Sequence, residues 1–151
     1  MKLGYTIVYV PDVAASLAFF ERAFGLQRKF LHESGAYGEL DTGSTTLSFA
    51  AHALGELNFA GGHVHADTSA QPLGFEIALV TDDVPAAHAK AVAAGAREMA
   101  APVAKPWGQL VSYVRCPDVC WWSCAHPSLA EPPICIPAAG DGRPRPGTLS
   151  A

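Results

Sequence analysis

The residues best suited to chemistry are a glutamate in an apolar stretch and three histidines near the middle of the chain. Glu76 lies within the otherwise apolar run 75–81, and burying an unpaired carboxylate is costly. It is therefore a ligand or general base facing a cavity, or else an edge-exposed or salt-bridged residue. His63 and His65 are one residue apart, a spacing that could bind a metal, although histidines in a glycine-rich loop are more often solvated. His52 ends a predicted strand and could face a cavity.

Two further candidates, Trp107 and Gln109, lie at the start of a predicted strand that would line a cavity. Trp107 either stacks on a flat ligand or simply packs against its neighbours. His88 lies on a predicted helix and is expected at the surface. The cysteines lack the paired Cys-x-x-Cys spacing of zinc sites, so we expect thiols in or beside a strand rather than metal ligands (Cys116, Cys120, Cys124 and Cys135).

The composition excludes several classes of function. The chain has 151 residues, a formal net charge of -4 and a pI of about 5.8, and its Lys and Arg form no stripe, so nucleic acid is not an expected partner. No apolar run approaches the roughly 20 residues of a membrane span. There is no Gly-x-Ser-x-Gly elbow and no phosphate-binding glycine loop. The strand-like start does not read as a signal peptide, so we expect a cytoplasmic protein without a membrane partner.

The elements that would position the candidate residues form a repeat with an offset of about seventy residues. Each copy predicts a strand, a turn with an aspartate, an amphipathic helix and a glycine stop. The first copy uses 3–10, Asp12, 13–24 and Gly25, and the second uses 75–81, Asp82, 84–94 and Gly95. Three more strands are predicted after each helix, at 27–33, 37–42 and 45–52 and at 97–101, 109–115 and 120–125.

The predicted fold class is α+β, with two βαβββ modules forming a curved mixed sheet around a cavity. We place the first module at 1–54, a polar, glycine-rich linker at 55–73 and the second module at 74–126. Residues 127–151 are rich in Pro, Gly, Ala and Arg. They cannot bury enough apolar surface to fold alone, so an irregular, disordered tail is predicted.

Five segments of the chain carry the pattern of a known family, namely 9–20, 24–26, 74–84, 106–109 and 113–118. Through these segments, over about residues 3–118, the chain resembles the vicinal oxygen chelate superfamily, which contains glyoxalases, bleomycin-resistance proteins and extradiol dioxygenases. This resemblance implies a cavity between two modules, commonly in a dimer. It also implies a divalent metal held by His or Glu on the first and fourth strands of each module, with open positions for two substrate oxygens. The superfamily includes several enzyme classes and proteins that bind drugs without chemistry.

The four ligand positions of the superfamily fall on Tyr5, Ser48, Glu76 and Ser123, where Tyr5 rather than Thr6 assumes a one-residue slip between the halves. Only Glu76 is a strong ligand, so the resemblance implies a degraded metal site. Glu76 remains the candidate metal ligand and catalytic residue. A divalent ion (Ni, Zn, Mn or Fe) stays an option, but no cofactor is the first expectation. The candidate substrate-binding residues are Tyr5, Ser48, His52, Trp107 and Gln109.

The last predicted strand departs from the superfamily's pattern, in which Pro-Asp-Gly precedes an apolar strand carrying a glutamate. Here Pro117-Asp118 is followed by Val-Cys-Trp-Trp-Ser-Cys. Because Trp has the single codon TGG and Cys is TG plus a pyrimidine, one G restored before codon 119 gives Gly, then Leu, Val or Met, then Leu-Val-Glu-Leu. This requires an AG-type codon at Ser123.

Two explanations fit this pattern. Either a single-base loss near codon 119 replaced a glutamate by Ser123 and generated the tail, or the C-terminus is naturally divergent. In the first case the cysteines and the two tryptophans of this segment result only from the changed reading frame, and we expect them to be exposed.

Two function classes remain. In the first, the protein binds a small, partly aromatic molecule in the cavity between the modules. In the second, it is a metal-dependent glyoxalase-like lyase or related enzyme, in which the metal would polarise a carbonyl while a carboxylate moves a proton. A protein whose activity was lost is a third, weaker interpretation. The expected partners are a small-molecule ligand and a second copy in a homodimer.

Overall fold

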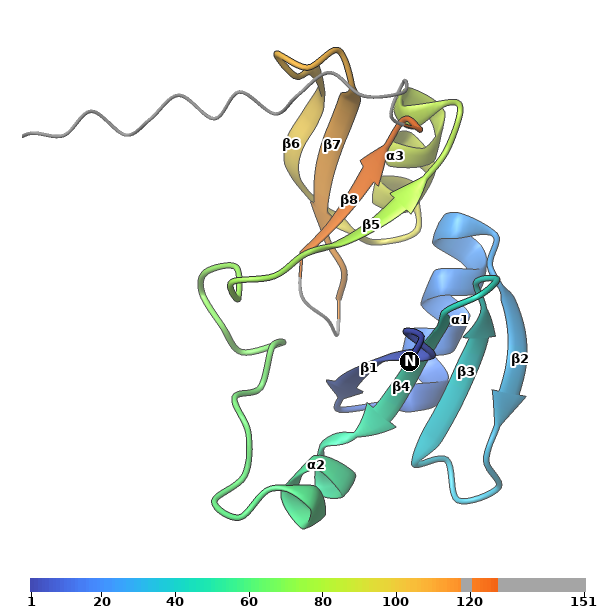
Figure 1. The fold of residues 1–151 in the computed structure, drawn as a ribbon, viewed down its shortest axis with the longest axis vertical. Helices are drawn as coiled ribbons and strands as arrows, with labels where there is room; N and C mark the ends of the chain where they lie inside the picture. Colours follow the sequence, from blue (N-terminus) through green and yellow to red (C-terminus); the bar gives the residue numbers. More distant parts are fainter. Residues whose placement is uncertain (118–120, 128–151) are drawn as a thin grey trace, which may run out of the picture.

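The computed structural model describes residues 1–117 and 121–127, which form two successive βαβββ modules (Figure 1). The first module comprises β1 (Tyr5–Val10), α1 (Val13–Phe24), β2 (Gln27–Leu31), β3 (Tyr37–Asp41) and β4 (Thr46–Ala51). A short helix, α2 (His52–Asn58), follows it. The second module comprises β5 (Ile77–Val80), α3 (Val84–Ala93), β6 (Arg97–Ala104), β7 (Leu110–Arg115) and β8 (Trp121–Ala125).

Each module contributes one four-stranded mixed sheet. The strand orders are β1-β4-β3-β2 and β5-β8-β7-β6, so the first strand of each module lies at a sheet edge. The pairs β1–β4 and β5–β8 are parallel, and the remaining pairs are antiparallel. The predicted α+β class with two βαβββ modules is confirmed.

The repeat is built on equivalent helix caps. The Asp12 carboxylate accepts a hydrogen bond from the backbone N–H of Ala15 at 2.9 Å, and the Asp83 carboxylate does the same for Ala86 at 2.9 Å. Asp83, rather than the predicted Asp82, is thus the partner of Asp12, and the modules are offset by 71 residues at their helix starts. Gly25 ends α1 with a φ of 71°, a conformation that favours glycine.

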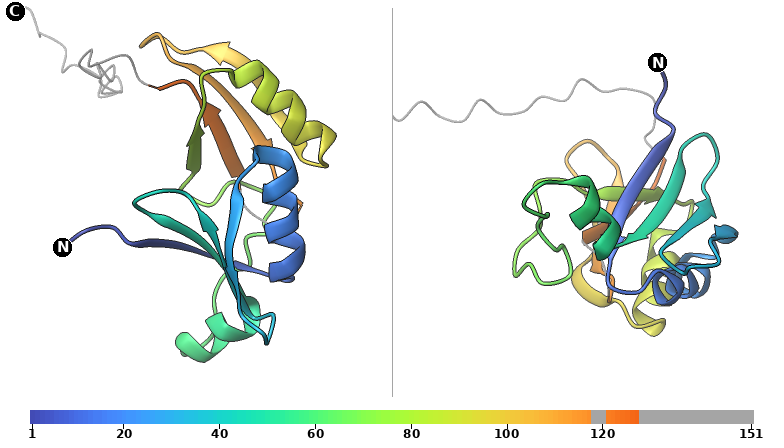
Figure 2. Two further views of the ribbon diagram at one scale, coloured as in Figure 1. Left: turned by 90° about the vertical axis from the view of Figure 1, so that its right-hand side faces the viewer. Right: turned by 90° about the horizontal axis from the view of Figure 1, so that it is seen from below.

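One hydrophobic core spans both modules. Its largest fully buried side chains include Phe20 of α1, Phe49 of β4 and Trp122 of β8. Helices α1 and α3 lie side by side and cover the same side of the molecule (Figure 2). On β1, Val8 and Val10 are buried whereas Tyr5 and Ile7 are exposed, so one face of the sheet meets the helix and the other stays open.

The structure differs from the sequence prediction around β4 and β5. The strand predicted to end at His52 ends at Ala51, and His52 begins α2, which extends into the segment predicted as linker. Strand β5 starts at Ile77, so Glu76 precedes the strand instead of lying inside it. Strand β6 reaches Ala104 rather than 101, because two register shifts let its alanine- and proline-containing end keep pairing with β7.

Three expectations about exposure are wrong. His88 is buried, because α3 packs on β6 and the His88 Nε2 atom lies 2.7 Å from the Glu98 carboxylate. Cys124 is buried as well, and so is Trp122, because β8 enters the core. These side chains are therefore not exposed, whatever the origin of the segment.

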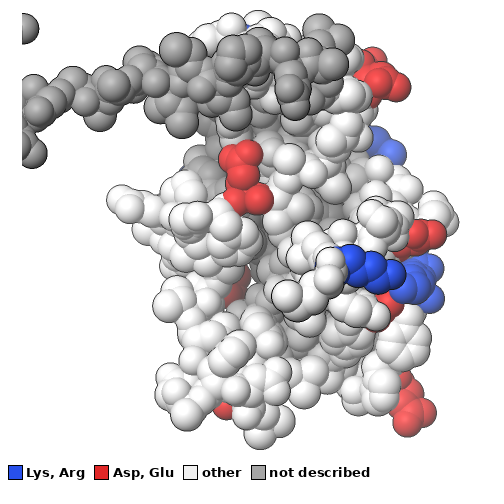
Figure 3. Space-filling model, in the orientation of Figure 1, with Lys and Arg blue, Asp and Glu red and all other residues white. Residues whose placement is uncertain are grey.

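Some predictions lie outside the described residues. These are the tail from residue 128 onward, Cys120 and Cys135. Within the described part of the chain, no helix is long and apolar enough to cross a membrane. On the face shown in Figure 3, Lys and Arg side chains are few, and most of them lie at the right-hand side next to Asp and Glu side chains.

Candidate functional site

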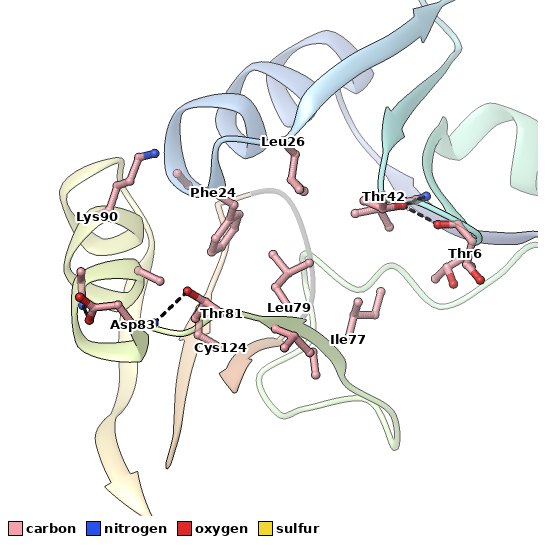
Figure 4. Close-up of a pocket in the computed structure, with 17 residues that line it drawn as sticks. Thr6, Phe24, Leu26, Thr42, Ile77, Leu79, Thr81, Asp83, Lys90 and Cys124 are labelled. Carbon is pink, nitrogen blue, oxygen red and sulfur yellow. Dashed lines mark hydrogen bonds between the residues drawn. The ribbon is translucent and has the colours of Figure 1, made fainter. Parts of the chain in front are cut away.

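A cleft of about 760 Å³ is lined by residues from both modules (Figure 4). The apolar side chains of Ile77 and Leu79 on β5 lie opposite Phe24 and Leu26, which end α1 and lead into β2. Leu47 of β4 and the small residues of α3 add to this apolar lining. The repeat therefore produces a cleft between its halves, as the duplicated strand–helix pattern predicts.

The polar groups of this cleft are few. Its lining includes Asp83, Lys90 and four threonines (Thr6, Thr42, Thr45 and Thr81). The Asp83 carboxylate already caps α3, whereas Lys90 forms no ion pair with any residue that the structure describes. Burial raises the pKa of the Cys124 thiol, so Cys124 is protonated at neutral pH and a weak nucleophile. The cleft thus offers apolar contact and one available cation.

A second cleft, of about 560 Å³, lies on the open face of the second module. Glu76 lines it together with Phe75, Met99 and Tyr113. Glu76 is exposed, and its carboxylate accepts a hydrogen bond from the Ser123 hydroxyl at 3.4 Å. This is the one place where two of the superfamily ligand positions meet through a contact between described residues.

The other two positions, Tyr5 and Ser48, lie on the open face of the first module. With an offset of 71, Tyr5 is equivalent to Glu76, which supports the one-residue slip assumed from the sequence. The pairings Ile7–Ser48 and Ala78–Ser123 are equivalent in the same way. The four positions therefore form two equivalent pairs, one in each module, and neither of the two clefts is lined by both pairs.

A separate cluster of three histidines lies where α2 meets the following loop. The ligand nitrogens of His52, His63 and His65 all lie within 4.8 Å of one another. The rings of His52 and His65 are stacked with centroids 3.7 Å apart, and His52 Nε2 lies 3.1 Å from the Asp67 carboxylate. Burial, and after it the neighbouring His65, lower the pKa of His52. Three imidazoles this close could hold a divalent metal.

A comparison with models of known protein families identifies the superfamily of this chain. The model of the Glyoxalase/Bleomycin resistance protein/Dioxygenase superfamily matches residues 2–123. The chain belongs to that superfamily. The resemblance inferred from the sequence is thereby confirmed for almost the whole described part of the chain.

Solved structures agree on the fold. A superfamily enzyme from Burkholderia phytofirmans PsJN is 24% identical, with a TM-score of 0.70 over 85% of this chain and 100% of that one. A glyoxalase-related enzyme from Fulvimarina pelagi is 21% identical, with a TM-score of 0.71 over 84% and 88%. TioX from Micromonospora sp. ML1 is 18% identical, with a TM-score of 0.62 over 85% and 100%. A comparison with curated proteins found no match.

In the first module, the residues at the superfamily's strand positions, Tyr5 and Ser48, are neither histidines nor carboxylates. Ser48 is fully buried, and its hydroxyl lies 3.0 Å from the Tyr37 hydroxyl, which is also 3.1 Å from the Glu39 carboxylate. Burial, together with Glu39, raises the pKa of Tyr37, so this phenol stays protonated. The Lys29 ammonium lies 3.0 Å from Glu39 and already supplies a cation there. No catalytic step through a metal follows from these residues.

The remaining predicted site residues fall outside both clefts. The Trp107 indole N–H donates to the Gln109 side chain at 3.1 Å, and the Gln109 amide donates to the His126 carbonyl at 2.7 Å. Both residues belong to the β6–β7 connection and the turn beside it. His52 belongs to the histidine cluster. Neither cleft has any of these three side chains in its lining.

Sequence reasoning missed Asp67, Tyr37 and Lys90. Asp67 had a signal, because it continues the alternation of His63 and His65 by one further step of two residues. Tyr37 lies on the same strand face as Glu39, two residues away. Lys90 had no signal in the sequence, since only the packing of α3 beside α1 brings it to the cleft.

Proposed function

We propose that this protein binds a small, partly aromatic molecule in the cleft between its two modules, with a degraded metal site at the superfamily's strand positions. The observation that carries this proposal is the apolar lining from both modules around about 760 Å³, a volume within the usual range for ligand sites. The Lys29–Glu39 ion pair and the buried Ser48 support the absence of a metal from the first module.

The lining also favours a type of ligand. Apolar contact area for a flat or branched apolar ligand is provided by the side chains of Phe24, Leu26 and Leu79. Lys90 at the margin favours a carboxylate or phenolate on that ligand, because the ammonium has no other ion-pair partner in the described chain. Since the pKa of Cys124 is raised and Asp83 caps a helix, the cleft supports binding rather than covalent chemistry.

We also propose that the protein forms a homodimer. Strands β1 and β5 are sheet edges, with unpaired backbone groups on one side. They or the residues beside them carry exposed apolar side chains, among them Tyr5, Ile7, Phe75 and Val80. Light scattering coupled to gel filtration tests this: a single species of twice the chain mass supports it, and a monomer at micromolar concentration contradicts it.

An enzymatic function is the second candidate, because Glu76, Ser123 and Tyr113 meet on the open face of the second module. A glyoxalase-like lyase or related enzyme acting on a vicinal-oxygen substrate would use Glu76 as ligand or base there. It would need further ligands from another segment or copy. Isomerisation of an α-keto aldehyde thiol adduct that stops with chelator and returns with Ni, Zn, Mn or Fe would support this alternative.

A thermal-shift panel of small aromatic acids, with and without chelator, tests the binding proposal. A ligand at a hundred times its Kd stabilises the folded state by about 2.7 kcal/mol, which corresponds to a melting-temperature rise of roughly 5–10 °C. The substitution Leu79→Trp fills the cleft and should abolish the shift. Leu57→Trp, at a position 82% exposed, is the matched control and should keep it. A shift that survives in Leu79→Trp would contradict the proposal.

A further inference from the structure

The histidine cluster is assembled from two segments, and its three histidines line neither cleft. His52 is the first residue of α2, and His63 and His65 come from the loop after this helix. All three side chains are partly buried. Neither cleft includes them, and none of them occupies a superfamily strand position. The function proposed above therefore leaves this cluster unexplained.

The hydrogen bonds of His52 determine which nitrogens face the centre of the cluster. An ionised carboxylate only accepts hydrogen bonds, so Asp67, 3.1 Å from His52 Nε2, requires the proton on that nitrogen. His52 Nδ1 then carries a lone pair, and it lies 2.9 Å from His63 Nε2. A carboxylate that holds the far nitrogen of a histidine is the usual outer arrangement of metal sites, where it orients the ligating ring.

The packing around His63 holds its ring in place. The ring lies 4.8 Å from the ring of Tyr9, and Gly55 of α2 lies against its other edge. A Cβ at Gly55 would come within 2.6 Å of His63 Cε1 and 2.7 Å of Nδ1. Glycine inside a helix costs about 1 kcal/mol relative to alanine. The sequence accepts that cost at the position where it leaves room for the imidazole.

The spacing of the nitrogens in the cluster is close to that of a metal site. The His52 and His65 rings are stacked face to face, with an interplanar angle of 1°. Zn²⁺–nitrogen bonds are about 2.0–2.1 Å long, so ligand nitrogens of a tetrahedral site are about 3.4 Å apart. The distance between His52 Nδ1 and His63 Nε2, 2.9 Å, is shorter than this spacing, and the upper limit for all three ligand nitrogens, 4.8 Å, is longer. Small movements of the rings would therefore bring the nitrogens to the spacing of a metal site.

We propose that His52, His63 and His65 form a binding site for one borderline divalent cation such as Zn²⁺, Ni²⁺ or Co²⁺, with Asp67 as the residue that orients His52. Imidazole nitrogens favour these ions over Mg²⁺ and Ca²⁺, which prefer oxygen. Three protein ligands leave a fourth position for water or an external donor. The site is distinct from the proposed cleft and from the Glu76–Ser123 pair.

Metal binding at this site would connect the two modules. The Arg115 guanidinium of β7 donates to the backbone carbonyls of Asp67 and Ser69 at 2.8 and 2.7 Å. The loop that carries two of the ligands is therefore held by the second module, while His52 follows directly on β4 of the first. An ion that joins them binds the folded chain and stabilises it by an amount that grows with the logarithm of its affinity.

The test uses the full chain without a polyhistidine tag, stripped with chelator and then titrated with Zn²⁺ by calorimetry and with Co²⁺ by visible absorption. One ion per chain, a rise in melting temperature and the d–d bands of tetrahedral Co²⁺ are expected. His63→Ala/His65→Ala should lose the ion, and Asp67→Asn should weaken binding about 10–100-fold. His32→Ala, which removes an exposed histidine outside the cluster, is the control and should bind as the parent does.

Three results would overturn the site. The first is the absence of any retained ion in the parent chain, and the second is equal binding by the parent and the double variant. The third is a near-ultraviolet thiolate-to-Co²⁺ charge-transfer band, which would place the ion on cysteine. Circular dichroism confirms that each variant folds, and His65→Gln replaces the double variant if that one does not. None of these readouts uses a cleft ligand, so the outcome is independent of the proposed function.

Discussion

Phe20 of α1 and Trp122 of β8 pack edge to face with ring centroids 4.6 Å apart, and this contact joins the cores of the two modules. Both side chains are fully buried. Phe24, one turn further along α1, lies 6.5 Å from Trp122 and 5.3 Å from Phe20. Phe24 also lines the cleft, so the aromatic cluster forms part of the wall on which the proposed ligand would rest.

Trp122 is expected to contribute volume rather than hydrogen bonding. Its indole N–H is buried and finds no acceptor in the described chain. Trp122→Ala should therefore cost about 3–5 kcal/mol in unfolding free energy, whereas Trp122→Phe removes the unpaired donor and should cost less than about 1.5 kcal/mol. Urea unfolding measures both. The exposed Trp107→Ala is the control, at about 0.5 kcal/mol or less. Equal losses in the two Trp122 variants would contradict this account.

Gly55→Ala should separate helix stability from metal binding. The substitution favours α2 by about 1 kcal/mol in propensity, but its Cβ would displace His63. We expect little net gain in stability and a large loss of Zn²⁺ affinity, measured by calorimetry. Ala53→Gly, at an exposed position of the same helix, should lower stability and leave Zn²⁺ affinity unchanged. Unchanged affinity in Gly55→Ala would show that His63 is not a ligand.

Ser123→Glu tests the equivalence of this position with the superfamily's last ligand. A glutamate there would stand beside the Glu76 carboxylate, which now accepts from Ser123 at 3.4 Å. Like charges at this separation repel, so the melting temperature should fall at neutral pH and recover with Mn²⁺ or Ni²⁺. Ser123→Gln has the same size without the charge and should show no recovery with metal. A Ser123→Glu variant indifferent to metal would remove Ser123 from the ligand position.

The origin of the C-terminal segment is testable from the coding DNA. A single-base loss near codon 119 requires an AGT or AGC codon at Ser123, because the restored frame then reads GAG. A TCN codon would contradict the loss and leave a naturally divergent C-terminus. The unpaired indole of Trp122 in the core is consistent with the loss, because the restored frame places valine at that position.

Cys124 should titrate late and be protected by a cleft ligand. Its pKa is raised above the ordinary 9.0 by burial, so the thiolate is scarce near neutrality and its alkylation rate should still be rising above pH 9. Mass spectrometry with iodoacetamide follows each cysteine separately. A bound ligand should slow modification of Cys124 and leave Cys116, which does not line the cleft, unchanged. Fast alkylation of Cys124 at pH 7 would contradict the assigned burial.

Most of the fold could be predicted from the sequence, because the local sequence signals agree with the observed helices and strands. Asp12 and Gly25 mark the start and stop of α1 through a side-chain cap and a positive φ, and the second copy repeats them. Helix α2 was missed because its alanine, leucine and glutamate residues are interrupted by Gly55, whose role depends on His63. The burial of His88 was missed because its partner Glu98 lies on a neighbouring strand.

The candidate sites were only partly predictable for the same reason. The resemblance placed Glu76 and Ser123 at ligand positions of the superfamily, without predicting their contact, and the repeat predicted a cleft between the halves. The cluster of His52 with His63 and Asp67 depends on how α2 turns the chain back, which the sequence does not specify. The Trp107 indole N–H donates a hydrogen bond to the Gln109 side chain. Hydrophobic periodicity does not reveal a contact between residues only two positions apart.

The central claim is that the cleft between the modules binds its ligand without help from a metal ion. Calorimetric titration of the best compound from the aromatic acid panel into chelator-stripped and Zn²⁺-loaded protein tests it most directly. The account predicts the same Kd in both states, within about twofold. Affinity that falls more than about tenfold on stripping, equivalent to about 1.4 kcal/mol, would contradict it and make the metal part of the ligand site.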